Sequence, residues 1–210
     1  MARSPIEPVV FVVDDDEAVR YFLKELIESV GLHVETLESA QAFLERVDPG
    51  IPGCLVMDIR MPGKSGLELL RELSDEGIDL PAIVLTGHGS VAVAVHAMKS
   101  GAVDFIEKPF NNELLLDSIQ RAVSQSLSDY VSRVSRETIA ERLALLTRRE
   151  RQILDLVISG ETNKGIANTL GIGEKTVELH RGHMMHKMEA SSLASLIRMA
   201  LTLDVFGGNP

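Results

Sequence analysis

The sequence has almost no cysteine and no long apolar run. Its single cysteine, Cys54, cannot form an internal disulfide, and the apolar residues around it indicate a packed thiol. No apolar run approaches the roughly 20 residues that span a bilayer. The N-terminal segment MARSPIEP also lacks the apolar stretch of a secretory signal. These absences argue against a disulfide-stapled secreted domain and a membrane protein, and we expect a cytoplasmic protein without a membrane partner.

An excess of positive charge is also missing. The net charge is −10 over 210 residues, which is unfavourable for binding nucleic acid. However, residues 1–143 carry a net charge of −11, and residues 144–210 are close to neutral at +1. The hydrophobic content of 45% is ordinary for a globular protein, and the length is sufficient for two small domains. The uneven charge therefore predicts two domains with different tasks.

The first part of the sequence alternates short apolar runs with helical patterns. We expect strands at 9–13, 32–37, 54–58, 82–86 and 104–108, and helices at about 16–30, 39–47, 66–76, 90–100 and 112–126. Ser39 and Ser90 are suitable N-caps for two of these helices. The alternation predicts an α/β domain over residues 1–126, with a doubly wound five-stranded parallel sheet. Residues 127–143 are rich in Ser, Arg and Glu, and we interpret them as a partly helical linker.

Residues 144–210 contain only helical patterns. Thr147 and Glu150 have the spacing of a capping box at the start of a helix. Two short helices joined by a glycine-containing turn are typical of the helix-turn-helix motif. The helices are expected at 147–159, at 163–170 with Asn163 as the cap, at 174–188, and from 191 or 192 onward. We therefore expect a small all-α domain of four helices.

Charged and polar residues follow the predicted strands. They are Asp14, Asp15 and Asp16 after the first strand, Asp58 at the end of the third, Thr86 at the end of the fourth, and Lys108 at the end of the fifth. The carboxyl ends of parallel strands meet at one edge of the sheet. Clustered carboxylates repel one another and favour a hard cation such as Mg²⁺. Taken singly, such residues are usually turn formers or helix caps. Together they predict a site where an aspartate accepts a phosphoryl group, helped by a metal ion and a lysine.

Four motifs in this first part resemble those of the CheY-like receiver domain, which has a flavodoxin-like fold. They are VVDDDEAVR at 12–20, MDIRMPGKSG at 57–66, LTGH at 85–88 and DFIEKPF at 104–110. The resemblance implies that Asp58 is the phosphoryl acceptor. It also implies that Mg²⁺, which Mn²⁺ could replace, is bound by Asp14, Asp15, Asp58 and the backbone carbonyl of Arg60. The positions that bind the phosphoryl group or switch with it would be Thr86, Lys108, Phe105 and Pro109, with a cis peptide bond before Pro109. Asp16 is an extra acid that could cap the first helix.

The helix expected at 174–188 has two different sides. If Val177 faces inward, Arg181, Met184 and Met188 fall near the same side. The opposite side could enter a DNA major groove, although a solvated helix face has the same pattern. That opposite side carries Lys175, Glu178, Leu179, Gly182, His183 and His186.

Residues 146–188 resemble the LuxR-type helix-turn-helix domain. The matching pieces are T-x-x-E at the start, NK-x-IA at 163–167 and KTVE-x-H at 175–180. The resemblance implies that Glu178, Leu179 and Gly182 face bases. Glu178 stands where some relatives carry lysine, and a glutamate can accept from cytosine N4. Candidate phosphate contacts and other DNA-binding positions are Arg148, Arg149, Asn163, Lys164, Lys175, Thr176, His180, Arg181 and His183.

A receiver followed by a LuxR-type domain is the arrangement of the NarL/FixJ class of two-component response regulators, and the sequence is most similar to the FixJ type. This implies that a histidine kinase phosphorylates Asp58. The phosphorylated chain would form a homodimer, bind double-stranded DNA at inverted or direct half-sites, and regulate transcription. Activation, with RNA polymerase as a further partner, is favoured over repression. Two alternatives stay open: a Mg²⁺-dependent phosphohydrolase with an aspartyl nucleophile, and a constitutive DNA-binding protein whose first domain only mediates interactions.

Overall fold

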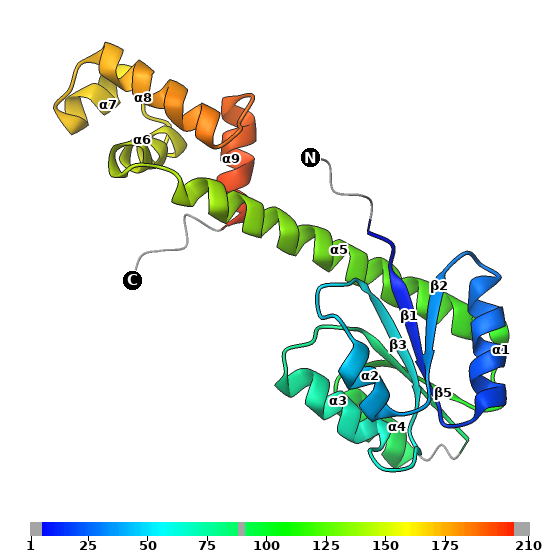
Figure 1. Cartoon of the computed structure of the whole chain (residues 1–210). Coiled ribbons are helices and arrows are strands. Elements are labelled where there is room, and N and C mark those ends of the chain that lie inside the picture. The colour runs from blue at the N-terminus through cyan, green and yellow to red at the C-terminus, as the bar shows by residue number, and fades with distance from the viewer. Residues whose placement is uncertain (1–5, 88–90, 204–210) are drawn as a thin grey trace. The chain divides into compact units, whose positions relative to one another are not determined.

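The computed structural model describes residues 6–87 and 91–203. The chain divides into two compact units, Met1–Val131 and Ser132–Pro210. The first unit is α/β and the second is helical (Figure 1). Within the described ranges, no helix combines the length and the apolar content that a bilayer crossing requires.

The first unit is built on the predicted five-stranded parallel sheet, with strand order β2-β1-β3-β4-β5. The strands are β1 (Val9–Val13), β2 (His33–Leu37), β3 (Gly53–Asp58), β4 (Ala82–Thr86) and β5 (Ala102–Glu107). Every residue of β1, β3 and β4 is buried, because helices cover both faces of a parallel sheet. The two edge strands are partly exposed.

Helices cover the two faces of this sheet (Figure 1). They are α1 (Glu17–Glu28), α2 (Ala40–Arg46), α3 (Gly66–Asp75), α4 (Val91–Lys99) and α5 (Asn112–Ala144). Helices α2, α3 and α4 pack Phe43, Leu69 and Ala97 on one face, and α1 and α5 pack Leu23 and Ile119 on the other. This layering confirms the doubly wound fold.

Polar side chains begin two of these helices, as predicted. The Asp16 carboxylate accepts from the backbone N–H of Ala18 and caps α1. The Ser39 hydroxyl accepts from the N–H of Ala42 and caps α2. Ser90, which we predicted as the cap of α4, lies outside the described residues.

Helix α5 extends well beyond its predicted end at about residue 126 and runs without a break to Ala144. The stretch that we interpreted as a partly helical linker is therefore helical throughout. Within it, Ile139 and Leu143 are only 6% and 7% exposed and belong to the core of the second unit. Sequence reasoning missed this packing because two apolar residues among Ser, Arg and Glu do not form a clear apolar stripe.

The second unit contains the four predicted helices among its described residues. They are α6 (Arg148–Ile158), α7 (Asn163–Leu170), α8 (Glu174–Lys187) and α9 (Leu193–Thr202). The capping box between Thr147 and Glu150 is confirmed. The cap of α7 is Thr162, whose hydroxyl accepts from the N–H of Gly165, so our choice of Asn163 was wrong. Asn163 is instead the first helical residue.

Candidate functional site

The carboxyl ends of the central strands bring three predicted site residues to one edge of the sheet. Val13 of β1 is level with Met57 of β3, so Asp14 and Asp58 follow at the same height on adjacent strands. Thr86 is the last residue of the next strand, β4. Asp14, Asp58 and Thr86 are 3%, 9% and 2% exposed. Polar groups buried this deeply require hydrogen-bonding or charged partners.

Lys108 supplies the positive partner for the two buried carboxylates. Its Nζ lies 2.8 Å from Oδ2 of Asp14 and 2.9 Å from Oδ1 of Asp58. Its backbone N–H donates to the carbonyl of Thr86 at 2.8 Å, and the Lys108–Pro109 peptide bond is cis, as predicted. Partial burial lowers the pKa of this ammonium group, but the hydrogen bonds and charges of the two carboxylates outweigh burial and raise the pKa overall. A lysine therefore holds these acids together.

Backbone groups and one arginine complete the shell around the two acids. Oδ1 of Asp14 accepts from the N–H of Asp16 at 2.9 Å, and Oδ2 of Asp58 accepts from the N–H of Arg60 at 2.6 Å. The guanidinium of Arg20, in α1, donates to the backbone carbonyl of Asp14 at 2.7 Å. Sequence reasoning missed Arg20, although it lies in the same VVDDDEAVR motif. Its guanidinium holds the turn that presents the acids.

Asp15 differs from its neighbours. It is exposed, and its carboxylate makes no hydrogen bond or ion pair with another described residue. Among residues 6–87 and 91–203, no three His, Cys, Asp or Glu side chains form a ready metal cluster. The chemistry of the donors nevertheless fits Mg²⁺, because Asp14, Asp15 and Asp58 offer the hard oxygen ligands that this ion combines with waters.

The two remaining predicted switch residues lie on or beside β5. Phe105 is half-buried and packs against the core on the side of α2, α3 and α4. Pro109 is exposed. Cys54 is buried inside β3, and this burial raises the pKa of its thiol to about 12, which confirms the prediction of a packed thiol.

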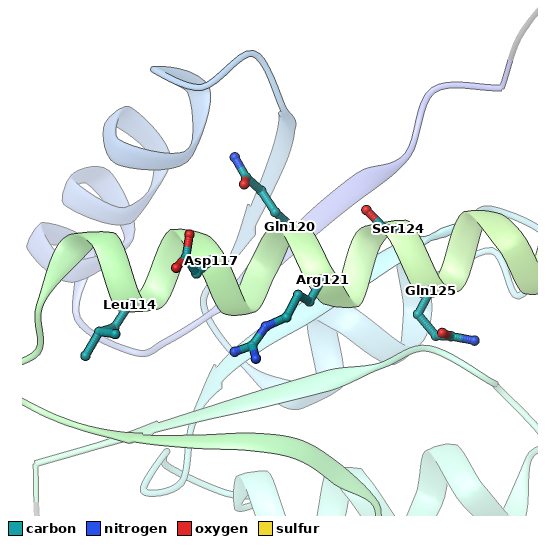
Figure 2. A pocket seen from close by; sticks show the side chains of 6 residues that line it. All are labelled: Leu114, Asp117, Gln120, Arg121, Ser124 and Gln125. Carbon is teal, nitrogen blue, oxygen red and sulfur yellow. The ribbon is translucent and has the colours of Figure 1, made fainter.

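A surface hollow of about 810 Å³ runs along α5 (Figure 2). Its lining side chains are Leu114, Asp117, Gln120, Arg121, Ser124 and Gln125. None of the predicted site residues lies in it. This open hollow is therefore separate from the acidic edge of the sheet.

In the second unit, α7 and α8 form the helix-turn-helix. Val177, Met184 and Met188 are buried, which confirms the inward side of α8. The residues predicted for the opposite side are all exposed; they are Lys175, Glu178, Leu179, Gly182, His183 and His186. Helix α8 therefore presents a mixed, mostly polar side to solvent.

The predicted phosphate contacts are not equally accessible. Arg148, Lys164 and Thr176 are exposed, whereas Arg149, Asn163, His180 and Arg181 are half-buried. The guanidinium of Arg181 donates to the side-chain oxygen of Asn163 at 2.7 Å. Two of the candidates thus bond to each other and connect the start of α7 to the middle of α8.

A partly buried ion pair that the sequence did not reveal connects α6 to α8. The Lys187 ammonium donates to Oε2 of Glu150 at 2.7 Å. Burial raises the pKa of Glu150, but hydrogen bonds from Lys187 and Thr147 outweigh it and lower the pKa to about 2. This pair fixes the last turn of α8 against the first turn of α6.

Two family models match the chain. Residues 10–120 match the response regulator receiver domain, and residues 144–200 match the bacterial regulatory proteins of the luxR family. Receiver domains generally bind Mg²⁺ at their acidic pocket. The family also implies a histidine kinase as partner and binding to DNA.

Similar proteins extend over most of the chain. The transcriptional regulatory protein FixJ of Azorhizobium caulinodans is 47% identical over 199 residues, which cover 93% of each chain. Nodulation protein W of Bradyrhizobium diazoefficiens is 44% identical over 206 residues, 97% of this chain and 89% of that protein. The solved structure of response regulator StyR has a TM-score of 0.85 at 42% identity, covering 93% of this chain and 98% of that one. The chain therefore belongs to the FixJ-like response regulators, transcriptional regulators that join a receiver domain to a LuxR-type DNA-binding domain.

Proposed function

We propose that phosphorylation of Asp58 by a histidine kinase switches this regulator on. The observation that carries the proposal is the position of Lys108, whose Nζ contacts both Asp14 and Asp58 at 2.8 and 2.9 Å. A lysine in this place stabilises the carboxylate of unphosphorylated Asp58, and it can stabilise the phosphoryl group once Asp58 is phosphorylated.

The transfer itself requires little more than positioning. A carboxylate oxygen of Asp58 attacks the phosphorus atom of the kinase phosphohistidine. The new P–O bond forms as the P–N bond breaks, and the histidine nitrogen leaves with the bonding electrons and takes up a proton. The N–H of Arg60 and the ammonium of Lys108 hold the two oxygens of Asp58 in place before the attack.

The metal-binding residues would be Asp14, Asp15, Asp58 and the backbone carbonyl of Arg60. A bound Mg²⁺, or Mn²⁺ in its place, would neutralise charge on the transferring group. Within this set, the carboxylate of Asp15 makes no hydrogen bond or ion pair with another described residue. Lys108 and the N–H of Asp16 donate to the carboxylate of Asp14, and Arg20 donates to its backbone carbonyl. We therefore expect the position of Asp14 to change little when the metal binds.

The response to phosphorylation would start at Thr86 and Lys108. Once Asp58 carries a phosphoryl group, the hydroxyl of Thr86 and the ammonium of Lys108 donate to its oxygens. Phe105 then repacks between β5 and the neighbouring helices, and the surface around α4 and β5 changes. We propose that this new surface forms a homodimer.

Dimerisation would bring two helix-turn-helix units to one DNA duplex, at inverted or direct half-sites. The exposed side of α8, with Glu178, Leu179, Gly182 and His183, would meet the base edges. Phosphates would be contacted by the basic and polar residues around it, namely Arg148, Arg149, Asn163, Lys164, Lys175, Thr176, His180 and Arg181. Bound in this way, the dimer would activate transcription through RNA polymerase, in the cytoplasm where bacterial DNA lies.

The test is to incubate the full chain with acetyl phosphate, with and without Mg²⁺, and to measure intact mass and oligomer size. We expect the mass of one phosphoryl group to be gained only with the metal, together with a shift from monomer to dimer. Asp58→Asn should show neither change.

Asp16→Asn is the matched control, because it removes a charge from the same acidic run while asparagine remains a good cap for α1. This variant should be phosphorylated like the wild type. If Asp58→Asn still gains the group, the acceptor is another residue. If the wild type gains it but stays monomeric and binds DNA no better, the switch does not act through dimerisation.

A further inference from the structure

The C-terminal end of α8 has an unusual backbone. Met188 is the C-cap, and the next residue, Glu189, has φ = 50°. It is the only non-glycine residue with positive φ in the described part of the chain. Glycine normally occupies this position after a helix, because a side chain strains the left-handed conformation. The contacts of the Glu189 side chain show what offsets this strain.

That side chain binds Arg142. One guanidinium nitrogen of Arg142 donates to the Glu189 carboxylate, and another donates to the backbone carbonyl of Met188 at 3.4 Å. A cation at a helix C-terminus is also favoured by the free carbonyls and the helix dipole. Both contacts of Arg142 thus lie directly after the last turn of α8. We call this arrangement the Arg142–Glu189 clasp.

Arg142 is itself firmly placed. It lies on the last turn of α5, between Ile139 and Leu143, which are buried in the core of the second unit. Its side chain is 24% exposed, compared with 68% for that of Glu189. The clasp therefore connects the exposed residue that follows α8 to an arginine next to two core residues of α5.

We infer that Arg142 is a positioning residue for DNA binding, which acts through Glu189 and Met188 to fix how α8 meets the duplex. The inference rests on the proposed role of α8 in reading DNA. An acidic residue such as Glu189 is a poor partner for phosphates, so any effect of the clasp on DNA binding is indirect. Helix α5 also supplies Leu115 and Ile119 to the core of the first unit. The DNA-reading helix is thus tied at one end to the helix that begins in the receiver.

The decisive variant is Glu189→Gly in the full chain. Glycine relieves the left-handed strain, which favours the folded chain, but it also removes the carboxylate that binds Arg142. Stability should therefore be kept or rise while the positioning of α8 is lost. The variant also loses a negative charge, which alone would tighten binding to DNA. The probe is a duplex enriched from a random library by the wild-type chain in the presence of acetyl phosphate and Mg²⁺.

For Glu189→Gly we expect an unchanged or higher melting temperature and an affinity for this duplex about fivefold weaker, the size of one lost exposed ion pair. The slope of log affinity against log salt should stay as in the wild type, because no phosphate contact is lost. Arg142→Ala should weaken binding at least as much, again with the wild-type slope.

Arg136→Ala is the matched control, since it removes an exposed arginine of the same helix and should leave the affinity within about twofold. The exchange Arg142→Glu with Glu189→Arg should recover part of the lost affinity. A Glu189→Gly chain that binds as tightly as the wild type overturns the inference alone. A wild-type chain that enriches no duplex overturns the proposed function and the inference with it.

Discussion

Ser126 lies on α5, yet its hydroxyl oxygen accepts a hydrogen bond from the backbone N–H of Gly53 at 3.0 Å, at the start of β3. Both residues are buried. No side chain fits at Gly53, because a Cβ there would lie 1.8 Å from the carbonyl oxygen of Val9. Ser126→Ala leaves this N–H without its partner, and we expect the receiver to lose about 1 to 2 kcal/mol of unfolding free energy. Urea unfolding measures the loss.

Ser128→Ala is the control for that experiment, because it removes an exposed hydroxyl from the same helix. It should change the unfolding free energy by less than about 0.5 kcal/mol. An equally small effect of Ser126→Ala would mean that another group replaces the lost acceptor.

Glu150 links stability to pH. Its pKa is about 2 in the folded chain, compared with an ordinary value of 4.5. Its stabilising contribution is therefore complete above about pH 4.5 and is lost as the pH falls toward 2. Glu150→Gln removes the charged partner of Lys187, and we expect the second unit to lose roughly 2 kcal/mol at pH 7. Melting curves of both chains at several pH values measure this difference.

The difference in melting temperature between the wild type and Glu150→Gln should narrow as the pH is lowered from about 4.5 toward 2. Glu161→Gln, at an exposed position, should melt like the wild type at every pH. A Glu150→Gln deficit that stays constant down to pH 2 would show that the carboxylate charge is not what stabilises this end of α8.

Which site residues can be predicted from the sequence depends on how their positions arise. Asp58, Thr86 and Lys108 follow from the rule that parallel strands end at one edge, so their convergence is predictable. Arg20 and Lys187 are not, because Arg20 binds a backbone carbonyl and Lys187 binds a residue 37 positions away. Neither of these two contacts follows from a recognisable spacing or motif in the sequence.

Among the helices and strands, the apolar runs predict all five strands to within two residues of their observed ends. The helix ends are harder to predict. Thr162 and Asn163 are both good capping residues, and only the extended backbone of Thr162 identifies it as the cap. The end of α5 was missed for another reason: the helix is stabilised beyond residue 126 by packing in the second unit, which local composition does not reveal.

Helix α8 contains a glycine, Gly182, that neither its backbone conformation nor the space around it requires. A Cβ added at Gly182 would meet nothing within 4 Å, and its backbone φ is not positive. Gly182→Ala should therefore stabilise the second unit by about 0.5 to 1 kcal/mol, the difference in helix propensity. Thermal melting of the full chain measures this gain.

Gly165→Ala in α7 is the contrasting variant. A Cβ there would lie 2.3 Å from Oε2 of Glu161, so the glutamate side chain must first move, and the gain should be smaller than at Gly182. If Gly182→Ala is destabilising, the glycine serves a packing role inside the folded chain rather than at its exposed surface.

At the scale of the whole molecule, the uneven charge correctly indicates two parts with different tasks, but it cannot locate where the second one starts. The luxR family match begins at residue 144, whereas the compact second unit begins at Ser132. Charge and composition mainly reflect the residues at the surface. The boundary between the two units instead depends on which side chains are buried in the core of the second one. Ile139 and Leu143 do so from a segment whose composition resembles a linker.

The boundary can be tested with two fragments, residues 132–210 and residues 144–210. The shorter fragment loses Ile139 and Leu143 from its core and the Arg142–Glu189 clasp. Burial of two aliphatic side chains contributes about 3 kcal/mol or more, a large part of the stability of a small domain. We therefore expect the longer fragment to melt cooperatively, and the shorter one to be mostly unfolded at 37 °C, as seen by circular dichroism.

The longer fragment with Ile139→Ala and Leu143→Ala separates packing from length, because alanine preserves the helix. It should melt well below the unmodified fragment and resemble the shorter one. If residues 144–210 melt at the same temperature as residues 132–210, the last turns of α5 are only a connection. If they melt lower by the expected margin, the last turns of α5 are a structural part of the DNA-binding unit, because Ile139 and Leu143 complete its core.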